Sequence, residues 1–515
     1  MPAAKEAPRA AQLPESAKTR VNLQAPGFVL SGVLVEGATV YNSLDFLPQY
    51  RDYLGKRITV EDLRRIAEAI TGKYHADGYF LSHTVLPAQN IEFGIVRFRV
   101  IEGYVSQWQM SGGAQADDPL LSKVLDAITG ERPLRRTTLD AAFQKLAALP
   151  DLTLHPYVRP LEDPVGAYVL ELGAKRRRFA GGVSLDNHGS QYIGPVEGVV
   201  ALRAFGLSGH HESYGVKFAT TSETGELHYY EFNSDWLLGA GGALFQFGAA
   251  HTTSHPGSIL KPLDVYIENE RWFVGLLYPL KRSSNTSASA GMELSSYHSR
   301  TDLLGAKRLE DELNAMKLSI HYVHQPEEAV TYALSLALIQ GLDVGGSKVV
   351  DTQSASGVGR PDFGKLTLNY QYVRIFRQRW EALVQIDGQY AATSLPSSEL
   401  YSLGGAGFGR AYDPSEITGD HGLAGRVEVD YLPATGASAV RMTPYAFYDI
   451  GKVWQMESQT GAGMASLASA GLGMRLAVAG VNAYMEAVKP LTRPVTSRES
   501  NTKGPRVFAG LSYEF

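Results

Sequence analysis

Leu403-Gly404-Gly405-Ala406-Gly407-Phe408-Gly409-Arg410-Ala411-Tyr412 is the stretch from which the fold of this chain is best worked out. It puts one arginine in a glycine-rich segment, and Gly419-Asp420-His421-Gly422 follows shortly after. Further on, Phe447-Tyr448-Asp449-Ile450-Gly451 places one aspartate in a strand-like segment. We therefore expect a long loop that carries a cation and a later strand that carries an anion.

The region around these motifs alternates apolar and polar residues in segments of about ten, which is typical of a transmembrane β-barrel. In the last segment Val507, Ala509, Leu511, Tyr513 and Phe515 oppose Gly510, Ser512 and Glu514. A soluble sandwich has the same period, so alternation alone leaves both folds open. Aromatic residues at the ends of the expected strands resemble interfacial girdles and favour the barrel; they are Tyr229, Trp236, Trp272, Tyr278, Trp380, Tyr431 and Trp454.

The predicted barrel spans residues 175–515, and from Arg178 to Phe515 there are about sixteen such segments, an even number, as a closed single-chain antiparallel barrel requires. On the expected strand from Tyr445 to Trp454, Phe447, Asp449 and Gly451 share one face. The other face is apolar and suits lipid, so Asp449 should point into the lumen. Arg410 lies in a long connection, residues 395–421, between the eleventh and twelfth expected strands. If that connection folds back inside the barrel, the arginine fork can grip a carboxylate through two hydrogen bonds.

Residues 21–174 have a different character, because helical patterns are mixed there with short strands. Thr59-Val60-Glu61-Asp62 has the form of a helix start, and Leu63, Ile66 and Ile70 recur at helical spacing. Two strand-like runs follow, from Phe80 to Leu86 and from Ile95 to Ile101. Residues 104–174 repeat this plan weakly, so we expect two copies of a strand-helix-helix-strand-strand module at 21–103 and 104–174.

Composition excludes several classes of protein. The chain has 515 residues, no cysteine and a net charge of -5, which predicts several domains, no disulfides and no affinity for nucleic acid. No apolar run is long enough for a transmembrane helix, and residues 1–20 lack the apolar core of a secretory signal. Phosphate-loop, zinc-protease and nucleophile-elbow motifs are absent, so we expect no enzyme, no catalytic residue, no cofactor and no metal. His210-His211-Glu212 indicates a turn.

Several of these motifs resemble the two-partner secretion (TpsB) transporters of the superfamily that includes BamA. Tyr74-His75-Ala76-Asp77-Gly78-Tyr79, Leu86-Pro87-Ala88-Gln89 and Val100-Ile101-Glu102-Gly103 resemble the family's first polypeptide-transport-associated (POTRA) domain. The loop tip Gly409-Arg410-Ala411-Tyr412 and the strand motif Phe447-x-Asp449-x-Gly451 resemble its conserved barrel motifs. The resemblance implies two periplasmic α+β POTRA domains ahead of a sixteen-stranded transmembrane antiparallel barrel, with Arg410 paired to Asp449. The chain departs from the family pattern at Ala411, where glycine is usual, and at Gly409.

The function that this resemblance implies is export of an unfolded TpsA-type exoprotein across the bacterial outer membrane. POTRA domains can add an extended client to an exposed strand edge; the client-binding candidates here are Phe80, Ser82, Thr84 and Leu86. A BamA-like insertase and a solute-conducting pore are the alternatives. Further expected partners are outer-membrane lipid and the barrel-assembly machinery, which would engage the C-terminal Phe515. Residues 1–20 are expected to form a mobile tail or a short plug. The identity of the client does not follow from the sequence.

Overall fold

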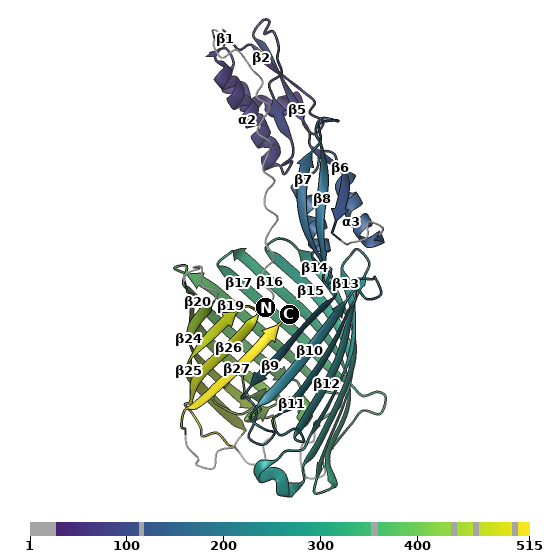
Figure 1. Cartoon of the computed structure of the whole chain (residues 1–515), viewed down its shortest axis with the longest axis vertical. Coiled ribbons are helices and arrows are strands. Elements are labelled where there is room, and N and C mark those ends of the chain that lie inside the picture. The colour runs from purple at the N-terminus through teal and green to yellow at the C-terminus, as the bar shows by residue number, and fades with distance from the viewer. Residues whose placement is uncertain (1–26, 113–117, 352–358, 434–439, 457–462, 497–502) are drawn as a thin grey trace. The chain divides into compact units, whose positions relative to one another are not determined.

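The computed structural model describes residues 27–112, 118–351, 359–433, 440–456, 463–496 and 503–515. The expected tail or plug at residues 1–20 lies outside this part of the chain. The chain divides into two compact units, Met1–Arg177 and Arg178–Phe515, close to the expected boundary between residues 174 and 175. The first unit combines helices with short strands, and the second consists almost entirely of strands (Figure 1).

The first unit begins with an α+β module whose sheet has the order β2-β5-β4. β2 is parallel to β5, and β4 is antiparallel to it. Helix α2 starts at the capping box that the sequence predicts, because Thr59 and Asp62 each accept a hydrogen bond from the other's backbone N–H. Leu63, Ile66 and Ile70 are buried in the module core, as expected. The elements are β1 (Phe28–Val29), β2 (Gly32–Glu36), η1 (Ser43–Phe46), α1 (Leu47–Tyr50), η2 (Arg51–Tyr53), β3 (Arg57–Ile58), α2 (Val60–Ala76), β4 (His83–Val85) and β5 (Ile95–Ile101).

A second module follows with the same topology. Its sheet has the order β6-β8-β7, in which β6 and β8 are parallel and β7 and β8 antiparallel. The predicted repeat of a strand-helix-helix-strand-strand plan is therefore confirmed. The elements are β6 (Tyr104–Ser111), α3 (Pro119–Thr129), α4 (Arg136–Leu146), β7 (Leu152–Pro160) and β8 (Ala167–Arg176). Among the described residues, no helix is both long and apolar enough to span a bilayer.

The second unit is a closed antiparallel barrel in which the last strand pairs with the first. Within the described residues, its wall has sixteen strands, as predicted, and the short β18 (Lys348–Asp351) pairs with β16 as an addition. The wall strands are β9 (Phe179–Asp186), β10 (Glu197–Phe205), β11 (Ser213–Thr221), β12 (Leu227–Leu238), β13 (Ala243–Ser254), β14 (Tyr266–Arg282), β15 (Thr286–Leu303), β16 (Ala306–Glu327), β17 (Val330–Leu342), β19 (Gly364–Phe376), β20 (Trp380–Ala391), β23 (His421–Tyr431), β24 (Arg441–Trp454), β25 (Met464–Val478), β26 (Val481–Pro490) and β27 (Arg506–Glu514). Two 3-10 helices, η3 (Ser258–Leu263) and η4 (Ser397–Glu399), lie in connections.

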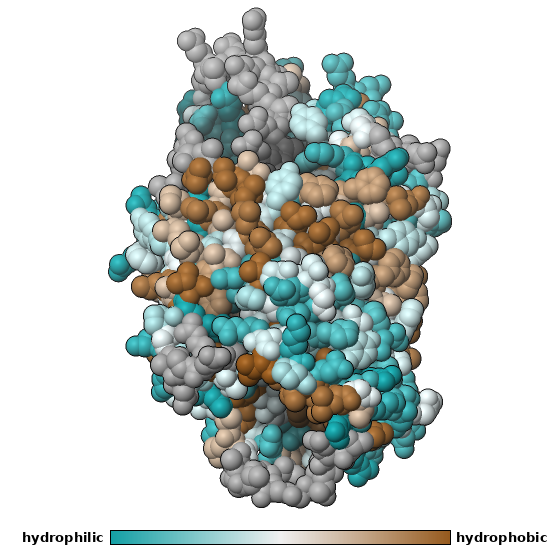
Figure 2. Space-filling view, turned by 60° about the horizontal axis from the view of Figure 1, so that its bottom comes forward, coloured by the Kyte–Doolittle hydropathy of each residue, from teal (hydrophilic) through white to brown (hydrophobic). Residues whose placement is uncertain are grey.

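The wall strands turn alternate side chains outward and inward, as the sequence pattern predicts. On β27, Val507, Leu511 and Tyr513 are exposed, and on its other face Phe508 is buried. Apolar side chains gather over the outside of the barrel (Figure 2). The expected aromatic girdle is only partly correct. Trp380 at the start of β20 packs on Tyr431 at the end of β23, whereas Trp272 lies within β14 rather than at its end.

Candidate functional site

The connection between β20 and β23 forms the candidate site. It joins the eleventh and twelfth wall strands, as predicted, and contains a small hairpin of β21 (Tyr401–Leu403) and β22 (Ile417–Gly419). Ala411 and Tyr412 at its tip are buried in an apolar cluster with side chains of β23 to β27. Arg410 is also buried. The predicted loop therefore folds back against the inner wall, and it carries its arginine with it.

Gly409 has the unusual backbone conformation in this loop tip. Its φ is +83°, and a Cβ there would come within 2.5 Å of Leu467 Cδ1. Ala411 is not among the described residues with positive φ, and it is fully buried. The left-handed residue required by the turn thus stands two positions before Ala411. The alanine that departs from the family pattern adopts a conformation that any residue tolerates.

Asp449 points into the lumen, as predicted. On β24 the odd-numbered residues from Thr443 to Val453 are buried, and the even-numbered ones are more exposed. Gly451 on the same face leaves room for the hairpin, because a Cβ there would come within 2.5 Å of Leu403 Cδ1. The three residues of the inner-wall motif, Phe447, Asp449 and Gly451, therefore all face the loop.

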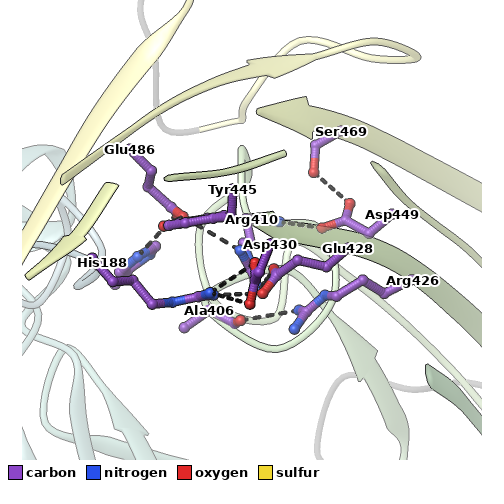
Figure 3. A network of polar contacts seen from close by, with 11 residues as sticks. His188, Ala406, Arg410, Arg426, Glu428, Asp430, Tyr445, Asp449, Ser469 and Glu486 are labelled. Carbon is purple, nitrogen blue, oxygen red and sulfur yellow. Dashed lines mark hydrogen bonds and ion pairs between the residues drawn. The ribbon is translucent and has the colours of Figure 1, made fainter. Parts of the chain in front are cut away.

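The predicted ion pair between the Arg410 side chain and Asp449 is wrong. Asp449 accepts a hydrogen bond from the backbone N–H of Arg410 at 3.3 Å and another from the Ser469 hydroxyl. The guanidinium extends past it to two other carboxylates (Figure 3). Its Nη2 lies 2.7 Å from Glu428 Oε2 and its Nη1 lies 3.4 Å from Glu486 Oε2. Asp449 thus binds the backbone of the loop tip, and Glu428 and Glu486 bind the guanidinium charge of Arg410.

Aromatic and charged side chains surround this pair. The guanidinium of Arg410 lies 4.1 Å from the centre of the Phe447 ring, which assigns the first residue of the inner-wall motif a stacking role. Tyr445 donates a hydrogen bond to Glu486 at 2.7 Å. Arg475 binds Glu428 at 2.5 Å and Asp430 at 2.9 Å. The anchor is consequently a network of alternating charges on β23, β24, β25 and β26, not a single pair.

The loop tip is also held near the closing strands of the barrel. Arg506 at the start of β27 lies 2.7 Å from Asp413 and donates a hydrogen bond to the carbonyl of Ala411. The hydroxyl of Tyr412 donates to the carbonyl of Ala468 at 3.2 Å. His188, which follows β9, lies 3.5 Å from Glu486 and stacks on Phe508 of β27. The last strands and the first therefore meet at the same network.

The Gly419-Asp420-His421-Gly422 motif closes the base of the loop. The Asp420 carboxylate accepts hydrogen bonds from the backbone N–H groups of Leu395 and Met456, at 2.7 and 2.9 Å. The ring of His421 accepts one from the N–H of Ala391 at 3.1 Å. Asp420 therefore joins the start of the loop to the segment that follows β24.

Sequence reasoning missed most of this network. The missed residues are His188, Asp413, Arg426, Glu428, Asp430, Tyr445, Ser469, Arg475, Glu486 and Arg506. A signal was present for part of it, because Arg426, Glu428 and Asp430 recur at a spacing of two on β23 and so share the lumen face. Charges at that spacing on one barrel strand predict a lumen cluster, although they do not identify its partner.

The client-binding candidates lie in the first module, and the structure shortens the expected strand. Only His83–Val85 forms β4, so Phe80 and Ser82 precede the strand and Leu86 follows it. Pro87 has no N–H to donate to a neighbouring strand. The Gln89 side chain forms hydrogen bonds with the backbone N–H and carbonyl of Arg97, which a longer β4 would otherwise pair with. Thr84 remains on a sheet edge, and its N–H donates to the Thr71 hydroxyl at 2.9 Å.

The other candidates have structural contacts. Ser82 is buried, and its hydroxyl accepts a hydrogen bond from the N–H of Gly103. Leu86 packs against the module core. Burial lowers the pKa of His83, beside Thr84 on β4. Burial raises the pKa of Tyr74 on α2, whose hydroxyl donates to Glu102 at 2.8 Å.

Among the residues that the structure describes, two groups of side chains resemble metal sites in composition. His298, Glu310 and Glu312 lie close together, but Lys348 already binds both glutamates at 3.2 and 2.9 Å. His251 lies close to Glu268 and Glu270, and is 3.3 Å from Glu270. Asp311, between Glu310 and Glu312, accepts hydrogen bonds from Ser397 and Ser398 at the start of the loop. At the predicted turn, the Glu212 carboxylate accepts the N–H groups of Ser208 and His210, so it caps that turn.

The fold is a POTRA-type module followed in the sequence by a closed barrel with an internal arginine loop, and the family matches place it in the class of two-partner secretion transporters of the outer membrane. The family model described as haemolysin secretion/activation protein ShlB/FhaC/HecB matches residues 169–476, and the ShlB-type POTRA domain matches residues 28–103. The chain belongs to the ShlB/FhaC/HecB family.

Individual relatives are distant in sequence. The heme/hemopexin transporter protein HuxB of Haemophilus influenzae is 21% identical over 88% of this chain and 81% of HuxB. Among solved structures, CdiB from Escherichia coli matches with a TM-score of 0.70 and 19% identity, over 98% of this chain and 94% of CdiB. BamA from Haemophilus ducreyi lacking POTRA domains 1–3 matches with a TM-score of 0.59 and 14% identity, over 95% of this chain and all of that one. These structures support the fold.

Proposed function

We propose that this chain exports a partner exoprotein of its own across the outer membrane, and that residues 28–103 and 104–174 act as two periplasmic POTRA domains. The client would arrive unfolded, bind these domains and pass through the barrel in extended form. The observation that carries the proposal is the loop 395–421, which lies in the lumen on a buried charge network. A loop held in this way occupies the path of a client, so its position controls passage.

The first POTRA domain supplies an edge for capture. Thr84 lies on β4, the outer strand of the sheet β2-β5-β4, where an extended peptide can add as a further strand. The hydroxyl of Thr71 already accepts the outward N–H of Thr84. A client strand that pairs with Thr84 must therefore displace Thr71, which makes capture a competition between helix α2 and client.

Export is the test of this proposal. The chain would be expressed with the exoprotein encoded beside it, and secreted client would be measured in the medium. Wild type should secrete the client, and Arg410→Ala should abolish secretion while a heat-modifiable barrel remains in the outer membrane. Normal secretion by the Arg410→Ala variant would refute the role of the loop.

A deletion separates this proposal from its alternatives. Without residues 27–103 the client should stay in the periplasm, and the remaining barrel should still assemble. If instead the deletion leaves export intact, the first module does not capture the client. A general loss of other outer-membrane proteins on removal of the gene would favour an insertase.

A further inference from the structure

Phe93 in the first module has a strained backbone conformation, and its side chain is almost fully exposed. Phe93 has a φ of +55°, a conformation that is rare for bulky residues, and it is 90% exposed. It stands at the first central position of a tight turn in which Ile95 N–H donates to the Glu92 carbonyl, and Gly94 follows with a φ of +73°. Turns of this kind favour Asn, Asp or Gly at both central positions.

Phe93 lies in the turn directly before β5, the central strand of the sheet β2-β5-β4, whose outer face is exposed. Ile95, Arg97 and Arg99 on β5 are exposed on this face, because Val96, Phe98 and Val100 point into the core. Leu34 of β2 lies opposite Arg97 and is also exposed. The exposed face thus has Ile95 at the end next to the Phe93 turn, then Leu34 beside Arg97, then Arg99 opposite Glu36 of β2.

The far end of β5 leads into a pocket of about 550 Å³ between the two modules of the first unit. Its apolar lining includes Val85, Ile101, Pro133 and Val165, and Arg99 and Arg132 contribute guanidinium groups. Arg132 stacks on Tyr104 at 4.2 Å, which holds its charge at the pocket. The one acid of the pocket, Glu102, already accepts hydrogen bonds from Thr39, Val40 and Tyr74.

We infer that this face binds an extended acidic segment of the client, with one apolar side chain beside Phe93 and another in the pocket. The inference rests on the proposed function, because the occupant is the exported protein. Ile95 and Ile101 lie six residues apart on one strand, a span of about 20 Å, so the two apolar side chains would be about six positions apart. Carboxylates between them would face Arg97, Arg99 and Arg132. Glu36 of β2 pairs with Arg99 across the sheet and lies 3.9 Å from Arg97, so client carboxylates would compete with it for these two arginines.

Substitution of Phe93 separates binding from folding. Phe93→Asn removes the aromatic ring and places a residue that tolerates positive φ in the turn. Protection of the β5 amides against hydrogen exchange in the full chain should stay the same or rise. A loss of protection would overturn the view that Phe93 is a binding residue, because it would assign the ring a role in folding. Leu44→Asn is the matched control, since Leu44 is 79% exposed but lies on η1, outside the sheet.

The binding probe is a synthetic peptide with two leucines about six positions apart and glutamates between them, measured by fluorescence anisotropy on the full chain in detergent. Phe93→Asn, and Arg97→Glu with Arg99→Glu, should each weaken binding by about tenfold or more, and Leu44→Asn should not. A peptide with lysines in place of the glutamates should bind poorly to wild type. Equal affinity of wild type and Phe93→Asn, equal binding of the lysine peptide, or no binding at all would overturn the inference.

Export distinguishes failure of this inference from failure of the proposed function. If the wild-type chain secretes no client, the proposed function fails, whatever the peptide data give. If wild type secretes the client and Phe93→Asn secretes it equally well, only the binding face is refuted. Reduced secretion by Phe93→Asn, together with normal secretion by Leu44→Asn, would support both.

Discussion

At the scale of single residues, the contact between Arg410 and Glu428 is the one we expect to hold the loop. Glu428→Gln removes the charge that binds both Arg410 and Arg475. Leaving buried cations without their partner costs about 3 to 5 kcal/mol in a dry site, and less where water enters. The loop 395–421 should therefore become sensitive to added protease in intact outer-membrane preparations, and export should fall.

An exchange of charges tests the identity of the partner. Arg410→Glu combined with Glu428→Arg should restore part of the protection of the loop that either single change removes. Arg410→Asp combined with Asp449→Arg should restore none, because Asp449 binds the backbone N–H of Arg410. Recovery in the second pair, and not in the first, would reinstate the partner that the sequence predicts.

Two glycines of the loop form a matched pair. Gly409→Ala should destabilise the docked loop by about 1 to 2 kcal/mol from its left-handed backbone, with a further cost from the approach to Leu467. Gly407→Ala should have little effect, because a Cβ there meets nothing within 4 Å and its φ is not positive. Protease cleavage of the loop in both variants measures the difference, and equal cleavage would contradict the role of Gly409.

Sequence motifs identified the two residues around which the site is built but not the residues that contact them. The alternation on β24 correctly predicted that Asp449 points inward, because the orientation of a side chain on a strand depends only on the strand period. The partner of the Arg410 guanidinium depends on how far the loop reaches into the lumen. Glu428, Glu486 and Asp449 all lie on inward faces, and no local pattern ranks them. The network therefore required the three-dimensional structure.

At the scale of elements, the edge of β4 has a built-in competitor in Thr71. Thr71→Val keeps the shape of the side chain but leaves the N–H of Thr84 without its partner, which costs the module about 1 kcal/mol. A client strand would satisfy that N–H, so a purified client fragment should bind the full chain up to about tenfold more tightly. Unchanged or weaker binding would argue against strand addition at β4.

The same strand should weaken in acid because of His83. Burial lowers its pKa in the folded module below the ordinary value of 6.5, so the unfolded chain binds the proton more readily. The stability of the module should therefore be greatest above that ordinary value and fall as the pH drops from it toward the folded pKa. Protection factors of the β5 amides from hydrogen exchange measure this fall, and His83→Gln should flatten it. An equal fall in the variant would place the titrating group elsewhere.

Element lengths were the least predictable part of the first module. The run from Phe80 to Leu86 has the composition of a strand, but only His83–Val85 pairs. Pro87 ends the ladder, and the Gln89 side chain takes its place beside Arg97. A side chain that substitutes for a strand leaves no periodic signal in the sequence. Helix α2, by contrast, follows from its capping box and its apolar face.

At the scale of the whole molecule, the barrel is closed by the shortest of its wall-strand pairings, that of β27 with β9. β27 and β9 pair from Gly510 with Asp186 to Glu514 with Gly182, and Phe515 adds two backbone hydrogen bonds to Gly181. Phe515→Ala keeps these backbone bonds and removes only the exposed ring. If the assembly machinery reads that ring, the variant should yield less heat-modifiable barrel in the outer membrane than wild type or Phe515→Tyr. Equal yields would remove Phe515 from the list of recognition residues.

The strand period of two and the even number of segments predicted the strands and allowed a closed barrel, and the aromatic residues and the family motifs favoured the barrel over a sandwich. Alternation separated the outer from the inner face on strands such as β27, and sixteen segments allowed closure. The girdle expectation was less secure. Trp272 lies within a long strand, and the sequence around it does not mark where β14 ends.

The network at the loop tip connects the internal loop to the place where the first and last strands close the barrel. His188 follows the first strand, Arg506 begins the last, and Glu486 contacts both His188 and Arg410. If the first and last strands drew apart sideways, His188 would leave Glu486 and Phe508. Separation of β9 from β27 and release of the loop from the inner wall would therefore break some of the same contacts. A substitution that weakens one of these two contacts should also destabilise the other.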